Sequence, residues 1–82
     1  MTRFFFDTRD GDDLFEDREG VEFAEAAEAE SAAIFALVSL ARDEFRHPAG
    51  RSIEMRVRDD EGNPVLTTTL SLVVQRPNQA ED

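Results

Sequence analysis

The clearest alternation of apolar and polar residues lies in the second half of the chain. In residues 51–59, Ile53, Met55 and Val57 alternate with charged side chains, and residues 64–74 show the same period after an Asp-Glu-Gly-Asn turn. This period of two is typical of strands that bury one face. Pairing the two segments across Gly62 predicts a hairpin with Val57 opposite Leu66, Met55 opposite Thr68 and Ile53 opposite Leu70. Both apolar rows then lie on one side, so the turn and the side-chain parity agree.

The middle of the chain carries apolar residues at helical spacing, which predicts one long helix from Phe23 to about Arg46. Pro48 and Gly50 are expected to end it. No Ser, Thr, Asp or Asn immediately precedes Phe23, so the N-terminal cap is weak and the start can shift by a turn. The stripe expected to face the core comprises Phe23, Ala27, Ile34, Leu37, Val38, Ala41 and Phe45, widened on one side by Ala26, Ala29, Ala33, Ala36 and Leu40.

The first residues predict another hairpin. Residues 3–7 have high β-propensity, Asp10-Gly11 is a turn signal, and residues 13–16 form a short return strand. A further turn is expected at residues 17–20. Alternation places Phe4 and Phe6 on one face of the first strand and Phe5 on the other.

These elements follow one another in the order β-β-α-β-β. One amphipathic helix on one half-buried antiparallel sheet predicts an α+β two-layer sandwich. We expect a single domain over residues 1–76 and a frayed C-terminal tail over residues 77–82. The first hairpin can dock on either side of the second, so the pattern leaves open which sheet edge is exposed.

Composition narrows the classes of partner. The 82 residues carry a formal net charge of −10, from 19 acids against nine bases that are all arginine, and they include no cysteine. An acidic field of this size repels phosphate groups, so we expect no direct nucleic-acid binding and no binding to anionic membranes. A basic protein partner would be attracted. No stretch resembles a secretory signal or approaches the ~20 apolar residues that span a bilayer, so we expect a cytoplasmic protein.

Two features of the sequence are candidate sites of chemistry. Carboxylates around Gly11 suggest a divalent cation, but Phe6 stands where the calcium-loop pattern requires its first Asp, so we interpret the cluster as a solvated turn with Asp-type hydrogen bonding. His47, the single histidine, lies at the expected helix end, where a dipole or capping role is usual. We therefore expect no enzyme, no catalytic residue, no metal and no cofactor. The acidic cluster comprises Asp7, Asp10, Asp12, Asp13, Glu16, Asp17 and Glu19.

Two residues do not fit the helix pattern. Glu30 falls inside the predicted apolar stripe, so it either is a buried carboxylate that marks a site or lies in water where the helix overhangs the sheet, and we favour the overhang. Phe35 falls on the polar side of the helix. The second sheet face is expected to carry apolar and Thr side chains, which favours self-association through its unpaired edges. The expected interface comprises Phe5, Phe35, Arg56, Val65, Thr67 and Val73.

Several short motifs recur together over nearly the whole chain. They are Phe5-Phe6-Asp7, Asp10-Gly11, Asp17 with Gly20, the Ala/Glu-rich helix ending in Leu40-Ala41-Arg42-Asp43, and Arg58-Asp59-x-x-Gly62-x-Pro64-Val65-Leu66. With these the chain resembles a family of short bacterial proteins catalogued as a domain of unknown function. The resemblance implies a compact, bacterial, cytoplasmic protein and transfers no catalytic residues. In element order alone the chain is also similar to the partner-neutralising domains of HicB-type bacterial antitoxins.

Two functional hypotheses follow. The first is a non-enzymatic protein-interaction or self-association module, for which a homodimer is expected. The alternative is an antitoxin-like neutraliser of a basic, RNA-handling partner, which would use the negative charge as a phosphate mimic and associate fast at low salt.

Overall fold

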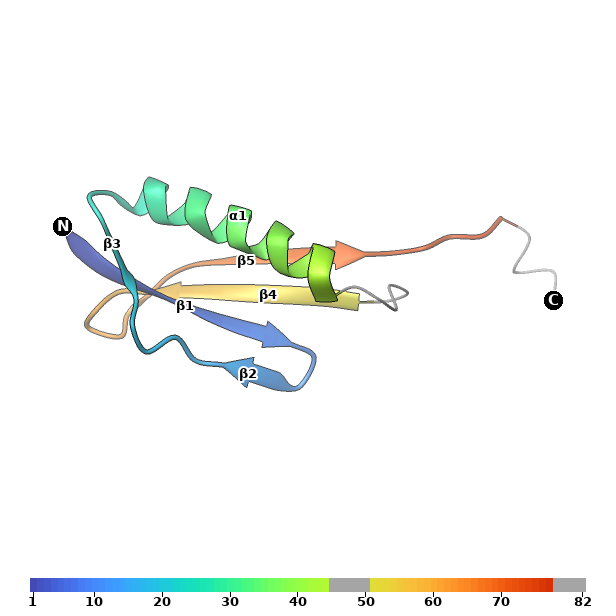
Figure 1. Cartoon of the computed structure of the whole chain (residues 1–82), viewed down its shortest axis with the longest axis horizontal. Helices are drawn as coiled ribbons and strands as arrows, with labels where there is room; N and C mark the ends of the chain where they lie inside the picture. Colours follow the sequence, from blue (N-terminus) through green and yellow to red (C-terminus); the bar gives the residue numbers. More distant parts are fainter. Residues whose placement is uncertain (45–50, 78–82) are drawn as a thin grey trace.

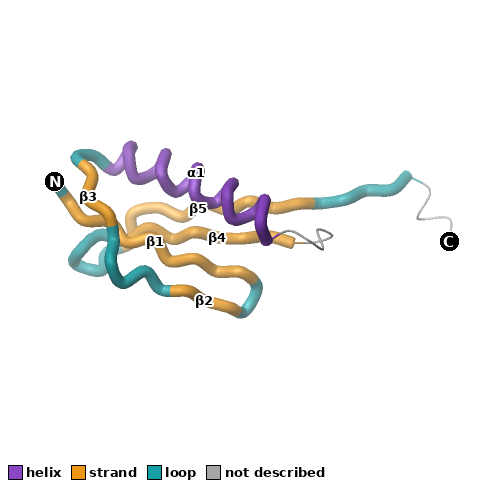
Figure 2. The backbone as a smooth tube through the Cα atoms, viewed as in Figure 1, coloured by secondary structure: helices purple, strands orange, loops and turns teal. Residues whose placement is uncertain are grey.

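The computed structural model describes residues 1–44 and 51–77 and contains one helix laid on one face of an antiparallel sheet (Figures 1 and 2). This confirms the α+β prediction. The order is β-β-β-α-β-β, because residues 21–23 form a short strand that the sequence did not predict. The elements are β1 Thr2–Asp10, β2 Asp13–Phe15, β3 Val21–Phe23, α1 Ala26–Glu44, β4 Arg51–Arg58 and β5 Pro64–Leu72. The predictions for Phe45, His47, Pro48, Gly50 and residues 78–82 lie outside the described residues.

The five-stranded sheet has the order β2-β1-β4-β5, and β3 also pairs with β1. All pairs are antiparallel. The first hairpin therefore docks through β1 onto β4, which leaves β5 at one edge of the sheet. The β4–β5 register confirms the predicted pairs Val57–Leu66, Met55–Thr68 and Ile53–Leu70.

A register shift between Val57 and Arg58 changes the position of one predicted interface residue. Val57 pairs with Leu66 whereas Arg58 pairs with Pro64, so Val65 is the extra residue of a bulge. Val65 is half-buried and packs against the core. The expectation that Val65 belongs to the outer face of the sheet is therefore wrong.

The core lies between α1 and the helix-side face of the sheet. Its helix contribution is narrower than predicted: Ala29 and Ala33 are fully buried, whereas Ile34 and Val38 are 49% and 56% exposed. Ala27 is exposed as well. The small alanines let the helix approach the sheet closely, so the face in contact is turned away from the larger apolar residues. The buried residues are Phe4, Ala29, Ala33, Leu37, Ala41, Ile53, Met55 and Val57.

The helix starts at Ala26, three residues later than predicted, because Phe23 ends β3. The cap lacks the usual Ser or Asp. Instead, Oε1 of Glu28 accepts hydrogen bonds from the backbone N–H groups of Ala24 and Glu25, both at 3.0 Å. This is the carboxylate half of a capping box, and it also places an acid at the positive end of the helix.

Candidate interaction surface

The strand β5 presents an uncharged edge. No strand among the described residues pairs with its outer side, and no charged residue occurs between Pro64 and Val74. In a chain in which 34% of residues are charged, such a stretch is unusual. Exposed edges are normally protected by charged side chains, because their backbone groups can pair with another chain. The bulge at Val65 and the proline at its start protect only the first part of β5.

The backbone groups that face this edge follow from the alternation of antiparallel hydrogen bonding. The N–H of Phe6 points away from β4, because it donates to Asp17. The backbone N–H and C=O of the next residue, Asp7, therefore point toward β4 and bond to those of Arg56. Because the backbone groups of Arg56 point toward β1, they do not bond to Thr67, the residue opposite on β5. The residues of β5 whose N–H and C=O groups point outward are then Thr67, Thr69 and Ser71.

Beside this edge, α1 presents a ridge of four residues spaced by four, Glu30, Ile34, Val38 and Arg42, which we call the α1 ridge. Val38, Ala41 and Arg42 line an open groove with Leu70, Ser71 and Leu72, which places the C-terminal half of the ridge on the β5 side of the helix. The spacing of four continues the same row to Ile34 and Glu30. The apolar members of the ridge, Ile34 and Val38, are each about half-exposed. Beyond β5, Val73 and Val74 are 68% and 48% exposed, and residues 73–77 lead away from the rest of the fold (Figure 1).

The predicted interface residues are not gathered at one place. Phe35 is 76% exposed on the side of α1 opposite the buried alanines, and Val73 follows β5. Phe5 lies on the outer sheet face but is half-buried, because the Arg58 guanidinium lies 4.6 Å from the centre of its ring. The outer face also carries Arg56, which is paired with Glu54, and Thr67.

The structure accounts for Glu30 differently from the prediction. Glu30 is exposed, as we expected. Its neighbour Ala29 is fully buried, so the helix does not overhang the sheet at this level. Glu30 lies in water because the α1 ridge runs beside the face of the helix that contacts the sheet. The hydrophobic pattern does not reveal the ridge as a surface, because it places Ile34 and Val38 in the core. The spacing of four that joins Glu30 to Arg42 is the sequence signal for it.

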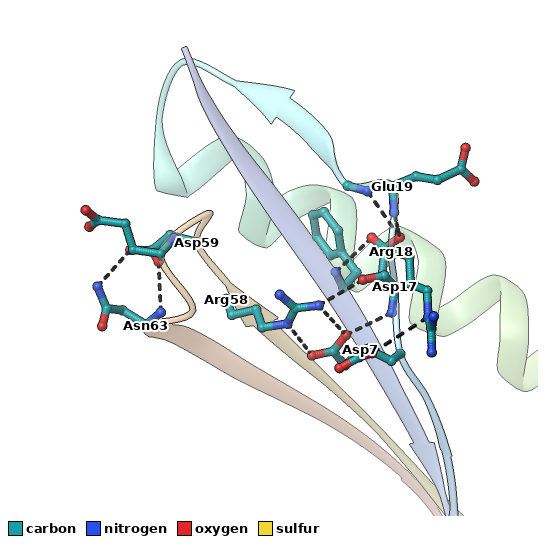
Figure 3. A network of polar contacts seen from close by, with 11 residues as sticks. Asp7, Asp17, Arg18, Glu19, Arg58, Asp59 and Asn63 are labelled. Atoms are coloured by element: carbon teal, nitrogen blue, oxygen red, sulfur yellow. Dashed lines mark hydrogen bonds and ion pairs between the residues drawn. The ribbon is translucent and has the colours of Figure 1, made fainter.

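A polar network on the outer face fastens the β2–β3 connection to the sheet (Figure 3). Arg58 donates to Asp7 Oδ2 through Nε at 2.8 Å and to the backbone oxygen of Asp17 through Nη2 at 2.8 Å. Asp7 Oδ1 accepts the N–H of Asp17 at 2.9 Å. The hydrogen bond to Asp7 raises the pKa of Arg58 above its ordinary value, against the opposing effect of burial. Through these bonds the network ties the β2–β3 connection to both β1 and β4.

Asp17 is the centre of this network. Burial raises the pKa of its carboxyl, but the N–H groups of Phe6, Gly20 and Glu19, with the charge of Arg58, outweigh burial and hold the pKa below its ordinary value. Asp17 lies beside residues 5–7 of β1, which pair with β4 on one side but with no strand on the other, since β3 pairs with residues 2–4 and β2 with residues 8–10. On that unpaired side, its carboxylate accepts the N–H of Phe6, which would otherwise bond to a neighbouring strand.

The predicted acidic cluster divides into two parts. Asp7 and Asp17 are half-buried in the network, so for them the interpretation as a solvated turn is wrong, although the Asp-type hydrogen bonds are present. The carboxylates at the β1–β2 turn and after β2 are exposed. Within the described ranges, no three His, Cys, Asp or Glu side chains lie close enough to hold a metal ion. The exposed members are Asp12, Asp13, Glu16 and Glu19, whereas Asp10, at the end of β1, is half-buried outside the network.

Residues 3–71 match the family model of a domain of unknown function, DUF6894. The chain belongs to this family. The match spans almost all of the helix and the strands. No curated protein and no solved structure matches the chain. No described helix is long and apolar enough to cross a membrane.

Proposed function

We propose that this member of the family is a non-enzymatic self-association module whose interface is the outer edge of β5. The observation that carries the proposal is the uncharged edge itself, which presents the backbone groups of Thr67, Thr69 and Ser71 beside an apolar groove. An edge of this kind binds an added strand through main-chain hydrogen bonds. Val73 and Val74 are exposed in the extended segment after β5 and would lengthen the paired strand.

A second copy of the chain is the occupant that the charges favour. Two copies of net charge −10 repel one another, and this repulsion is smallest where the contact surface carries no charge. An antiparallel pair of β5 strands about a two-fold axis uses the same edge from both copies. It joins the two sheets into one and leaves the acidic turn of each copy at the far edge, away from the contact.

Thr69→Pro tests the proposal. Its N–H points outward, so proline removes a donor from the edge and none from the β4–β5 ladder. By light scattering we expect a dimer for the wild type, a monomer for Thr69→Pro, and a dimer for the control Thr69→Ala, which keeps the N–H. Circular dichroism checks that the proline variant is folded. A wild-type chain that remains monomeric up to about 1 mM would overturn the proposal. A dissociation constant of that size corresponds to an association free energy of only about 4 kcal/mol.

The exposed carboxylates favour a second candidate function, the neutralisation of a basic, RNA-handling partner. Asp12, Asp13 and Glu19 lie at the edge of the sheet opposite β5, so this surface stays open when β5 is paired. Attraction of this kind weakens with salt. A tagged chain should therefore recover one basic partner from its own cells at low salt and release it at high salt, and a triple Asn/Gln variant of these residues should recover none. Equal recovery by the variant contradicts this function.

A further inference from the structure

The two-fold pairing of β5 brings a second pair of surfaces together, the α1 ridges. In the order β4-β5-β5-β4, strands lie about 4.8 Å apart. Helix α1 contacts both β4 and β5, so it lies on the face of the sheet, above the line between these two strands. The two helices are then about 10 Å apart, which is the spacing at which helices pack directly. The ridges then face one another across this space, because the groove places Val38 and Arg42 on the β5 side of the helix and the spacing of four continues the row.

The position of the two-fold axis can be estimated from each element separately. Along α1, the ridge is symmetric about the point midway between Ile34 and Val38. Along β5, the uncharged stretch from Pro64 to Val74 is symmetric about Thr69. The two points should lie at the same level if one axis serves both elements.

They do so within the precision of standard geometry. The groove sets Val38, Ala41 and Arg42 level with residues 70–72. Helix α1 and β5 run in the same direction (Figure 1). The middle of the ridge lies about 6 Å back along the helix, or about two residues back along the strand, which reaches Thr69. A single axis therefore centres both contacts.

This geometry is antiparallel for the helices, and the α1 ridge is self-complementary when antiparallel. It reads acid, apolar, apolar, base from Glu30 to Arg42. We propose that Glu30 of each copy pairs with Arg42 of the other, and that Ile34 packs on Val38, so that the ridge selects a second copy and fixes its register. Neither Glu30 nor Arg42 has an ion-pair partner in the described part of its own chain.

This inference rests on the proposed self-association and explains why the edge of β5 would pair with a second copy in one register. Reversing one charge replaces two attractive contacts per dimer with two repulsive ones. We expect Glu30→Arg and Arg42→Glu each to raise the dimer dissociation constant by about tenfold at low salt. The double variant has the wild-type net charge and should recover the wild-type constant. Asp12→Arg and Arg18→Glu change the net charge equally at the far edge and serve as controls.

Mixing the two single variants gives the sharper test. Each homodimer contains only like-charge contacts at these positions, whereas a heterodimer contains two opposite-charge contacts. Native mass spectrometry of an equimolar mixture should therefore show heterodimer well above the half that random pairing gives. Both residues are exposed, and circular dichroism verifies folding. If a reversal variant unfolds, Glu30→Gln and Arg42→Gln replace it, each weakening the dimer without repulsion.

The outcomes separate this inference from the proposal beneath it. A wild-type dimer that Thr69→Pro abolishes, but that no charge reversal weakens and in which variants mix at random, overturns the pairing of the ridges and leaves self-association standing. A wild-type monomer overturns both. A reversal that weakens the dimer no more than its matched far-edge control also overturns the pairing, since the effect is then one of net charge.

Discussion

The backbone N–H of Phe6 donates a hydrogen bond to Oδ2 of Asp17 at 3.0 Å. This contact occurs in the gap between the segments of β1 that pair with β2 and β3. The same carboxylate accepts the N–H groups of Glu19 and Gly20 through Oδ1. One side chain thus satisfies a donor of a half-buried strand and shapes the connection that leads into β3.

The ionisation of Asp17 should contribute to the pH dependence of the free energy of unfolding. Its pKa is lowered in the folded state. The stabilisation that this carboxylate supplies is therefore present above its unfolded pKa of about 3.9 and is lost as the pH falls through the lower folded value. Asp17→Asn should cost about 2 kcal/mol at pH 7. The difference from wild type in urea unfolding should shrink below about pH 4. Asp12→Asn, at the exposed turn, is the control, and a constant difference for Asp17→Asn contradicts the argument.

Gly20 should tolerate no side chain. Its φ is 71°, and a Cβ would lie 2.8 Å from Cγ of Arg3 and 2.9 Å from the backbone oxygen of Phe4. Gly20→Ala should therefore destabilise the domain by about 3 kcal/mol, from backbone strain and close contacts together. Gly11 has a φ of 64° with nothing within 4 Å of the added carbon. Gly11→Ala should cost only the strain, about 1 kcal/mol. Equal losses in thermal unfolding would show that the contacts are unimportant.

Arg58 should not be replaceable by lysine. Its guanidinium bonds two acceptors and lies over the ring of Phe5, and an ammonium group cannot do all three. We expect Arg58→Lys to lower the free energy of unfolding by about 1–2 kcal/mol. Arg56, on the same face, pairs only with its near neighbour Glu54 among the described residues. Arg56→Lys should change stability by less than about 0.5 kcal/mol. The ratio of the two losses is the quantity to measure.

The close approach of α1 to the sheet depends on alanine. Ala33 is fully buried, and Ala33→Leu must push the helix outward, at a cost of about 1–3 kcal/mol. Ala27→Leu makes the same change at an exposed position of the same helix, where helix propensity alone has little effect. Chemical denaturation of both variants checks this. A neutral Ala33→Leu would mean that the helix can move without loss of packing.

Self-association should also appear in thermal unfolding. A dimer that forms only from folded chains raises Tm as protein concentration rises. Val38→Asp places a charge on the α1 ridge and should remove this dependence. Phe35→Asp, on the opposite side of the helix, should retain it. A concentration dependence that survives Val38→Asp and disappears in Phe35→Asp would move the interface to the solvent side of α1.

The β4–β5 hairpin was predictable because turn and side-chain parity impose the same register. The buried face of α1 was not, because a hydrophobic pattern favours large residues such as Ile34 over Ala29, whereas a close-packed layer favours small ones. Strand β3 is too short to show a period. The network of Arg58 joins residues 51 positions apart and leaves no local signal. The α1 ridge has a local signal, its spacing of four, but its meaning depends on where β5 lies.

The uncharged edge of β5 is also a hazard, since strands of this kind nucleate open-ended assembly. The proposed two-fold contact would be isologous and closed, because each copy would contribute its β5 and no second such edge would remain. The opposite edge of the sheet consists of two three-residue strands, β2 and β3, separated by the connection that contains Asp17. It also bears exposed acidic side chains, so it offers no continuous strand on which further copies could pair. The fold thus permits a pair and discourages a fibril.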